Sequence, residues 1–502
     1  MKKVVQKVPK RSAPIDLSAD QFRKIGHDLV DKIAEFLDSI RSRPVTTDLT
    51  PAQIRAKLQS EIALPKEGTD PERLMQKAVD LLLENSLFNG HPRFWGYITS
   101  SPAPIGILAD MLASSMNQNL GGWQLSPMAT EIEAQSIRWI AEFLGYPSDC
   151  GGVLTSGGNM ANFVCFLAAR KAAAKYDIQS EGLKNSHLRV YASKETHTWI
   201  EKAADLFGLG TVNTRWIKTD SNQRLDINDL RSNIRHDIDN GDTPMMVVGT
   251  AGTVSTGAVD PLPEIADLCR EYRIWFHVDG AYGGFAAALK NIDENIYALR
   301  EADSIAVDPH KWLYAPLEAG CALVRDSEKM RSAFSYHPPY YHFGEEAVNY
   351  VDYGMQNSRG FRALKVWLAF QHVGRNGYIR MIEEDIHLAK EIYRLADNEP
   401  ELEALTHNLS ITTFRYIPPD LQERAAEEKV ALYLDTLNEE ILVRLKRGGE
   451  VFISNAVIND RFVLRSCIVN FRTSQDDVEA LPGIVIRYGR EADADLRPEM
   501  LA

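Results

Sequence analysis

Cysteine pairs, long apolar runs and an excess of positive charge are all missing from this sequence. The cysteines are few, odd in number and scattered: Cys150, Cys165, Cys269, Cys321 and Cys467. Without a Cys-x-x-Cys pair we expect no disulfide framework and no metal site, and a reducing compartment is the simpler interpretation. The sequence contains no run of roughly 18 apolar residues, the length needed to span a membrane. Its basic N-terminal end is not followed by the apolar stretch of a secretory signal. The expected location is therefore the cytoplasm.

The net negative charge of the chain argues against polyanionic partners. Lysine and arginine number 56 against 69 aspartates and glutamates, a net charge of −13, which argues against binding to nucleic acid or to an anionic membrane. Hydrophobic residues make up 44% of the chain and charged residues 25%, as in a globular protein. Because 502 residues exceed one ordinary domain, two or three lobes are expected.

The N-terminal part, residues 1–90, is predicted to be a helical segment. Ser18 is placed to cap a helix, and apolar residues recur at helical spacing from Phe22 to Ile40. The following stretch is typical of a linker, with Pro51 and Pro65 interrupting short helical patterns. The apolar helix face could pack on another lobe or on a partner subunit.

Residues 91–376 are predicted to form a large α/β domain. Short apolar runs predict strands at Arg189–Tyr191, Met245–Gly249, Ile274–Val278, Ser304–Val307 and Cys321–Val324. Helical patterns such as Met160–Tyr176 and Leu262–Tyr272 separate several of them. Strands that are apolar on both faces and alternate with helices indicate a mainly parallel sheet covered on both sides.

Residues 377–502 are predicted to form a smaller α+β domain. Its expected elements are a long helix after Tyr378, a strand at Leu409–Tyr416, a charged helix at Gln422–Lys446, and strands at Val451–Ala456 and Arg461–Val469.

Polar residues follow neighbouring predicted strands, where ligands bind in open α/β sheets. Asp279 ends one strand, and His310 and Lys311 follow the next strand along the chain. Asp279 and Lys311 could form a buried ion pair with a structural role. Alternatively they form a cofactor site, because a buried lysine can form an imine with an aldehyde cofactor and an aspartate can keep a pyridine nitrogen protonated.

A glycine turn, Ser156-Gly-Gly-Asn159, leads directly into a predicted helix. Backbone N–H groups at such a helix N-terminus favour a phosphate, although the same pattern also occurs as an ordinary capped turn. His197, taken alone, would also be an ordinary histidine.

Together, the glycine turn, His197, Asp279 and His310-Lys311 resemble the pyridoxal-phosphate-dependent group II amino-acid decarboxylases, most closely the aromatic-L-amino-acid branch. The resemblance runs from Leu17 to about Val478. Three stretches carry it most specifically: His277-Val-Asp-Gly-Ala-Tyr, Asp308-Pro-His-Lys-Trp and Phe361-Arg-Ala-Leu-Lys-Val-Trp. It implies a carboxy-lyase with the fold type I of pyridoxal-phosphate-dependent transferases (aspartate-aminotransferase-like): a mainly parallel sheet in the large domain and a small C-terminal α+β domain.

The resemblance also implies residue roles. Lys311 would carry pyridoxal 5′-phosphate covalently, and Asp279 would pair with its pyridine nitrogen. Ala281 and His197 would face the two sides of the ring, with His197 also contacting the substrate. The phosphate would be held by Gly157, Gly158, Asn159 and His310. Tyr340, at the position of a loop tyrosine that protonates the α-carbon in this family, would favour an amine product, since related aldehyde synthases carry Phe there. Alternatively, Tyr340 and Tyr341 are only aromatic loop residues.

Substrate choice rests on a predicted aromatic wall. The segment of Trp95 and Tyr97 resembles the family's side-chain pocket, with Trp123 nearby, contributed by this chain or by the partner subunit. Such rings suit a flat apolar side chain, although each could equally belong to the core. Gly121, where animal relatives carry Phe, suggests a roomier pocket and favours tryptophan-like substrates.

Two more departures from those animal enzymes concern polar contacts. Asp308 replaces an Asn. We expect an acid near the phosphate to point elsewhere, so Asp308 is given no ligand role. Val254 replaces a Thr, which removes a contact to His197.

The leading hypothesis is a decarboxylase of aromatic amino acids: tryptophan, tyrosine, DOPA or phenylalanine. One alternative is decarboxylation of glutamate, aspartate or cysteine sulfinate, for which Arg93 or Arg465 would have to bind the distal acid. Others are an aldehyde synthase and an inactive homologue that acts as a scaffold, against which the presence of Asp279, His197 and Lys311 argues. The resemblance further implies an obligate homodimer with active sites at the interface.

Overall fold

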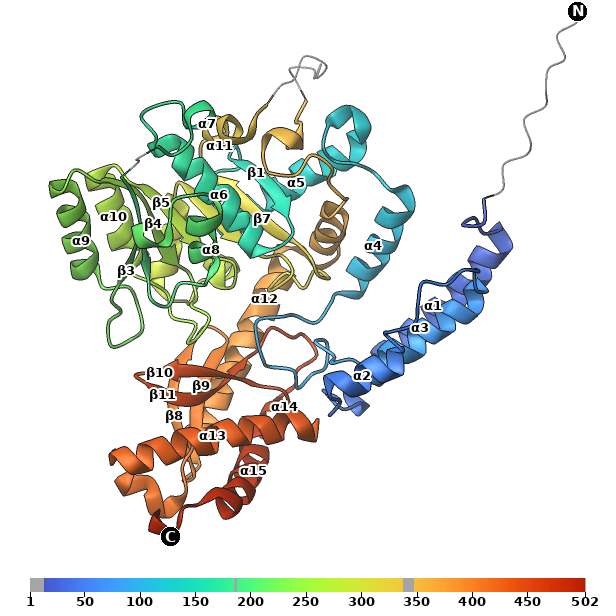
Figure 1. Ribbon diagram of the computed structural model, residues 1–502, viewed down its shortest axis with the longest axis vertical. Coiled ribbons are helices and arrows are strands. Elements are labelled where there is room, and N and C mark those ends of the chain that lie inside the picture. Colours follow the sequence, from blue (N-terminus) through green and yellow to red (C-terminus); the bar gives the residue numbers. More distant parts are fainter. Residues whose placement is uncertain (1–12, 185–186, 337–346, 502) are drawn as a thin grey trace, which may run out of the picture. The chain divides into compact units, whose positions relative to one another are not determined.

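The computed structural model describes residues 13–184, 187–336 and 347–501, and the chain divides into two units, Met1–Phe88 and Asn89–Ala502 (Figure 1). The first unit is helical, with α1 at Ala19–Ser39, a 3₁₀ turn at Ile40–Ser42, α2 at Pro51–Leu58 and α3 at Pro71–Asn85. The larger unit contains two sheets.

The helix starts of the first unit follow from their capping residues. Ser18 caps α1 in a reciprocal capping box with Gln21, as its sequence pattern predicts. The prediction for Pro51 is wrong: it does not interrupt a helix but begins α2, since proline's missing N–H leaves no donor unpaired at that position. No residue is buried in α1 or α3, both fully described, and apolar side chains such as Phe22 and Leu82 are exposed.

A seven-stranded sheet forms the centre of the larger unit, in the order β1-β7-β6-β5-β4-β2-β3. The strands are β1 Gly151–Thr155, β2 Leu188–Ser193, β3 Thr214–Ile217, β4 Thr243–Thr250, β5 Trp275–Asp279, β6 Ser304–Val307 and β7 Gly320–Val324. Only β7 runs against its neighbours. The mainly parallel sheet is therefore confirmed, with β1 and β3 as strands that the sequence patterns did not reveal.

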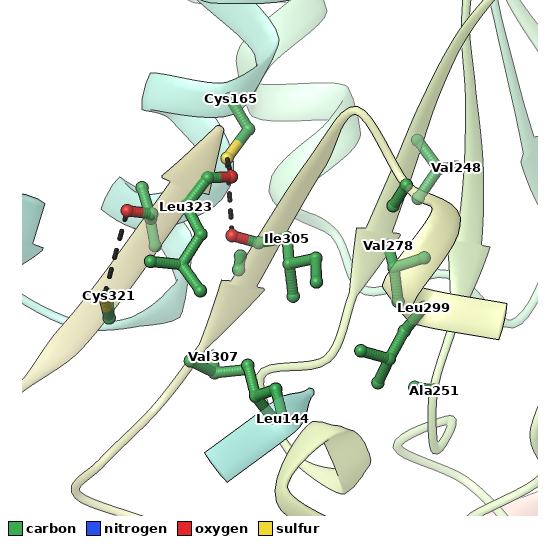
Figure 2. Packing of buried hydrophobic residues seen from close by; sticks show 14 of the residues in the cluster. Leu144, Cys165, Val248, Ala251, Val278, Leu299, Ile305, Val307, Cys321 and Leu323 are labelled. Carbon is green, nitrogen blue, oxygen red and sulfur yellow. Dashed lines mark hydrogen bonds between the residues drawn. The ribbon is translucent and has the colours of Figure 1, made fainter. Parts of the chain in front are cut away.

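Helices accompany these strands. They are α4 Pro104–Met116, α5 Pro127–Leu144, α6 Gly158–Ala173, α7 Ile178–Glu181, α8 Trp199–Leu206, α9 Ile227–Asp239, α10 Leu262–Tyr272 and α11 Ser327–Phe334. Of these, α5, α6, α9, α10 and α11 pack on the sheet. Every residue of β1, β5, β6 and β7 is buried. Figure 2 shows Val278, Ile305 and Leu323 from three of these strands in one apolar core. Among the described residues, no helix is long and apolar enough to cross a membrane.

The smaller α+β part has its own sheet, in the order β10-β11-β9-β8. Its elements are α12 Ala363–Asn398, β8 Leu402–Asn408, β9 Ile411–Tyr416, α13 Glu428–Gly448, β10 Ser454–Ile458, β11 Arg461–Cys467, α14 Gln475–Glu479 and α15 Leu481–Leu496. All pairs in this sheet are antiparallel, and a second hydrophobic core fills the space around it. α12 is kinked at Gly374, whose φ of 69° suits glycine.

A buried ion pair joins α5 to the strand that precedes the glycine turn. Arg359 and Glu133 are almost fully enclosed. Glu133 also accepts a hydrogen bond from the Leu154 backbone N–H, and Arg359 donates to the Leu154 carbonyl oxygen. The Arg359 guanidinium further lies 4.8 Å from the centre of the Tyr350 ring. Both charges are thus paired and hydrogen-bonded, as a buried position requires.

Breaking this pair should be costly. We expect Glu133→Gln to lower the free energy of unfolding by about 3–5 kcal/mol, because the Arg359 charge stays buried without its counter-ion. Urea unfolding monitored by fluorescence measures the loss. Glu301→Gln, which breaks the exposed pair with Arg270, should cost no more than about 1 kcal/mol. Equal losses in the two variants would contradict this account.

Candidate active site

The carboxyl ends of three parallel strands meet at one cavity. β4, β5 and β6 are neighbours, with Thr250 opposite Asp279 and Asp279 opposite Ala306. Lys311 follows β6 closely and lines the same cavity as Asp279, a space of about 430 Å³. The predicted convergence of Asp279, His310 and Lys311 is confirmed, because parallel strands end at the same edge of the sheet.

Asp279 is held in one orientation. Its carboxylate is 6% exposed. Oδ1 accepts a hydrogen bond from the Ala281 backbone N–H at 3.1 Å, and Oδ2 accepts one from Trp199 Nε1 at 2.7 Å. With a donor on each oxygen, the carboxylate is fixed in the cavity wall. Sequence patterns gave no sign of Trp199, since its contact with Asp279 spans distant segments.

Lys311 has a second acid beside it. Its Nζ lies 3.1 Å from Asp308 Oδ2. The Asp308 side chain is buried, and its Oδ1 finds no hydrogen-bond partner in the described part of the chain. The expectation that Asp308 points elsewhere is therefore wrong: it faces the cavity and the lysine, because a buried carboxylate needs a nearby cation. Asp308 therefore belongs to the site.

The two histidines of the site are held as neutral rings. His310 Nδ1 lies 2.7 Å from the Ala319 carbonyl oxygen, to which it donates, so Nε2 is unprotonated. Burial lowers the pKa of His310, and Lys311 acts in the same direction. His197 lines the cavity with one side open to solvent, and its Nδ1 accepts from the Trp199 backbone N–H. Partial burial lowers the pKa of His197, which favours the neutral ring. Because Nδ1 accepts a hydrogen bond, the hydrogen of the neutral ring is on Nε2, which can donate it.

The glycine turn forms a cradle at the N-terminus of α6. Gly157 has a φ of 101°, which favours glycine, and Gly158 is the first residue of the helix. A Cβ on Gly158 would lie 3.0 Å from the Ala281 Cβ. Asn159 lines the same cavity, and its buried Oδ1 has no hydrogen-bond partner among the described residues. The Asn159 oxygen can only accept, so the groups here that suit a phosphate are the backbone N–H donors at the start of α6.

The predicted aromatic wall is not found at this cavity. Trp95 is fully buried in the core of the smaller domain, where its Nε1 donates to Thr473. Tyr97 is 59% exposed, and Trp123 Nε1 donates to Glu131. Within this chain the apolar lining comes instead from Ile98, Val254 and Leu317.

Gly121 does not enlarge the cavity. A Cβ at this position would meet the Asn357 carbonyl oxygen at 2.2 Å, so backbone already occupies the space that a side chain would take. The prediction of a roomier pocket at Gly121 is therefore wrong. Tyr340 and Tyr341 lie outside the described residues.

No arginine among the described residues lines the cavity, whereas the carboxylates of Glu195 and Glu318 do. Arg93 pairs with Asp477 at 3.0 Å, and Arg465 donates to Ser454 Oγ. Neither Arg93 nor Arg465, the two predicted arginines, lies in the lining of the cavity.

Comparison with known proteins assigns the chain to a family. Residues 51–417 match the model of the pyridoxal-dependent decarboxylase conserved domain. The chain belongs to this family. It is 31% identical over 477 residues to an aromatic-L-amino-acid decarboxylase of Bacillus atrophaeus, covering 93% of this chain and 95% of the relative.

Solved structures of relatives agree with the assignment to the decarboxylase family. Oryza sativa TDC with PLP and tryptamine superposes with a TM-score of 0.88 at 28% identity, covering 96% of this chain and 99% of the other. Rhodiola rosea 4-hydroxyphenylacetaldehyde synthase superposes with a TM-score of 0.83 at 26% identity, covering 95% and 99%. The large mixed sheet and the smaller antiparallel domain are thus those of fold type I.

The family's cofactor, pyridoxal 5′-phosphate, fits the residues present. Lys311 offers an amine for its aldehyde, Asp279 a carboxylate for its ring nitrogen, and the Gly157–Asn159 cradle a set of N–H groups for its phosphate.

A buried acid supports the loop that carries Lys311. Asp385 of α12 accepts hydrogen bonds from Trp312 Nε1 at 3.0 Å and from Tyr314 Oη at 2.6 Å. Burial raises the pKa of Asp385 to about 7. The folded protein therefore retains this proton over a range in which the unfolded chain, with a pKa of about 4, has lost it.

This proton makes stability depend on pH. Between about pH 4 and pH 7 the folded state binds more protons at Asp385 than the unfolded state, so its contribution to stability falls as pH rises and levels off above pH 7. We expect the free energy of unfolding of Asp385→Asn, relative to wild type, to rise by roughly 4 kcal/mol across this range. Urea titrations at several pH values measure it.

Asp420 provides the control. The hydrogen-bonded Arg497 holds the pKa of Asp420 below its usual value, so the relative stability of Asp420→Asn should fall as pH rises. A flat difference for Asp385→Asn would contradict its protonation in the folded state.

Proposed function

We propose that this decarboxylase acts on aromatic L-amino acids (tryptophan, tyrosine, DOPA or phenylalanine) and releases the amine and CO₂. The observation that carries the proposal is the meeting of Asp279, Lys311 and His197 around one cavity with a phosphate cradle. When bound, the cofactor supplies an electron sink for the pair that remains on the α-carbon as CO₂ leaves.

The residues of the chain divide the remaining tasks. Lys311 Nζ would hold the cofactor through its aldehyde. Asp279 would pair with the protonated ring nitrogen, and the neutral His197 would offer its Nε2–H to the substrate carboxylate. Tyr340 remains the proposed source of the proton that the α-carbon then takes up.

The cavity lining supports an aromatic rather than an acidic substrate. Ile98, Val254 and Leu317 offer apolar contacts, whereas Glu195 would repel a second substrate carboxylate. Glu318 is paired with Arg362 and adds no unpaired charge. The Bacillus atrophaeus relative and the rice structure with tryptamine point to the same substrate class. The alternative is an aldehyde product, as named for the Rhodiola rosea relative. Tyr340 argues against this alternative, because related aldehyde synthases carry Phe at that position.

A product assay tests this function. Purified holoenzyme incubated with the four aromatic amino acids should form amine and CO₂ in equal amounts from at least one of them, with no hydrogen peroxide. Glutamate, aspartate and cysteine sulfinate should give little product, because Glu195 repels their second acid group and no arginine among the described residues lines the cavity to bind it. Lys311→Ala should abolish turnover, and borohydride reduction of wild type should attach the cofactor to the Lys311 peptide. Lys194→Ala, at an exposed lysine, should remain active.

The outcomes separate the alternatives. Preferential release of an amine from an acidic substrate would contradict the aromatic assignment. Aldehyde and peroxide in place of amine would show a synthase, and a wild-type protein without a Lys311 adduct would show a scaffold.

We also propose a homodimer with active sites at its interface, in which residues 1–90 pack on the partner. In the larger unit, α4 has an uncovered apolar face made of Leu108, Met111, Leu112 and Met116. Such a patch on a single chain is typical of a protein–protein contact. The exposed apolar side chains of α1 and α3 support the same inference.

The five free cysteines fit a cytoplasmic location.

A charge placed in this face should separate the subunits. We expect the double variant Met111→Glu, Leu112→Glu to sediment as a monomer where wild type sediments as a dimer, since each subunit would have to bury two charges in the interface. Val457→Glu, at an exposed apolar residue of β10, serves as the control and should remain dimeric. A monomeric wild type would refute the dimer.

A further inference from the structure

The orientation of Asp279 depends on a tryptophan that no sequence motif marks. Trp199 is the first residue of α8 and is fully buried. Its Nε1–H donates to Asp279 Oδ2 at 2.7 Å, while the Ala281 backbone N–H holds the other oxygen. With one donor on each oxygen, the carboxylate cannot rotate about its Cβ–Cγ bond without losing a hydrogen bond to a charged acceptor.

The indole of Trp199 is itself fixed from behind. The His277 ring meets it edge to face, with centroids 5.6 Å apart. His277 is completely buried, and burial lowers its pKa to about 4, so the ring is neutral. Its Nε2 lies 2.8 Å from Asn162 Oδ1 and its Nδ1 2.9 Å from Ser304 Oγ.

This chain of hydrogen bonds has a single direction. The amide oxygen of Asn162 can only accept, so His277 Nε2 carries the hydrogen and Nδ1 accepts from the Ser304 hydroxyl. Ser304 Oγ in turn accepts from Trp275 Nε1 at 2.8 Å. Both ring nitrogens of His277 are therefore satisfied, and the ring cannot turn away from Trp199 without leaving buried polar atoms unpaired.

We propose that Trp199 is a positioning residue for decarboxylation: its Nε1–H fixes the plane of the Asp279 carboxylate so that the remaining lone pairs face the ring nitrogen of the cofactor. The inference rests on the proposed role of Asp279. A carboxylate free to rotate would hold the ring nitrogen's proton less firmly, which weakens both the binding of the cofactor and its use as an electron sink.

The test removes the donor and keeps the ring. Trp199→Phe preserves an aromatic side chain against His277 but lacks Nε1–H. We expect the affinity of the apoprotein for pyridoxal 5′-phosphate to fall about tenfold, as for the loss of one hydrogen bond to a charged group. At saturating cofactor kcat should fall while KM for the amino acid is unchanged, and the absorption band of the bound cofactor should shift.

Tyr191→Phe is the matched control. It removes the buried O–H of Tyr191, on β2, which donates to another carboxylate, Asp237 of α9, at 2.9 Å, so it reports the general cost of such a loss. Its cofactor affinity, kcat and absorption band should equal those of wild type. Trp199→His, which returns an N–H donor to the site, should recover part of the affinity lost in Trp199→Phe.

The inference is overturned if Trp199→Phe binds cofactor and turns over like wild type, if Tyr191→Phe loses as much, or if Trp199→His is no better than Trp199→Phe. The proposed function fails by a different result, namely a wild-type protein that takes up no cofactor on Lys311.

Discussion

The buried carboxylate of Asp279 is the constraint on which the rest of the site depends. A negative charge inside a protein is stable only when hydrogen bonds and a nearby cation compensate it. The structure meets this need with two fixed donors, but it gives Lys311 to a different acid, Asp308. Two aspartates, Asp279 and Asp308, and one lysine, Lys311, therefore lie together in the cavity lining. A ligand that brings a protonated nitrogen to Asp279 and an aldehyde to Lys311 completes this arrangement, and pyridoxal 5′-phosphate has both groups.

The sheet supplies the geometry that such a ligand needs. Because β4, β5 and β6 are parallel neighbours, their ends place Thr250, Asp279 and the Lys311 loop along one edge. The start of α6 brings its N–H groups to the same cavity for the anionic end of the ligand. Behind the lysine, Asp385 ties the loop to α12. The site is thus built on rigid elements, which keeps the reacting groups in register.

The sequence predicts the parts of this site that depend on local order. Asp279 and Lys311 follow runs that are apolar on both faces, so their position at strand ends could be inferred directly. Trp199 and Asp385 could not be found in this way, since each acts through a contact between distant segments. Trp95 shows the opposite error: its neighbours in sequence suggest a pocket wall, but burial in the core of the smaller domain was the stronger demand. The position of Asp308 follows from the need of Lys311 for a counter-ion, which the run of residues around it does not reveal.

The same reasoning links the fold to substrate choice. A decarboxylase that accepts an acidic side chain must pair that second carboxylate with a cation inside the cavity. Among the described residues that line the cavity, the one lysine, Lys311, is paired with Asp308 and no arginine is present, while Glu195 adds a further negative charge. An apolar ring requires no such partner and gains from contact with Ile98, Val254 and Leu317. Charge balance, rather than an aromatic wall within this chain, is therefore the physical basis on which aromatic substrates are favoured.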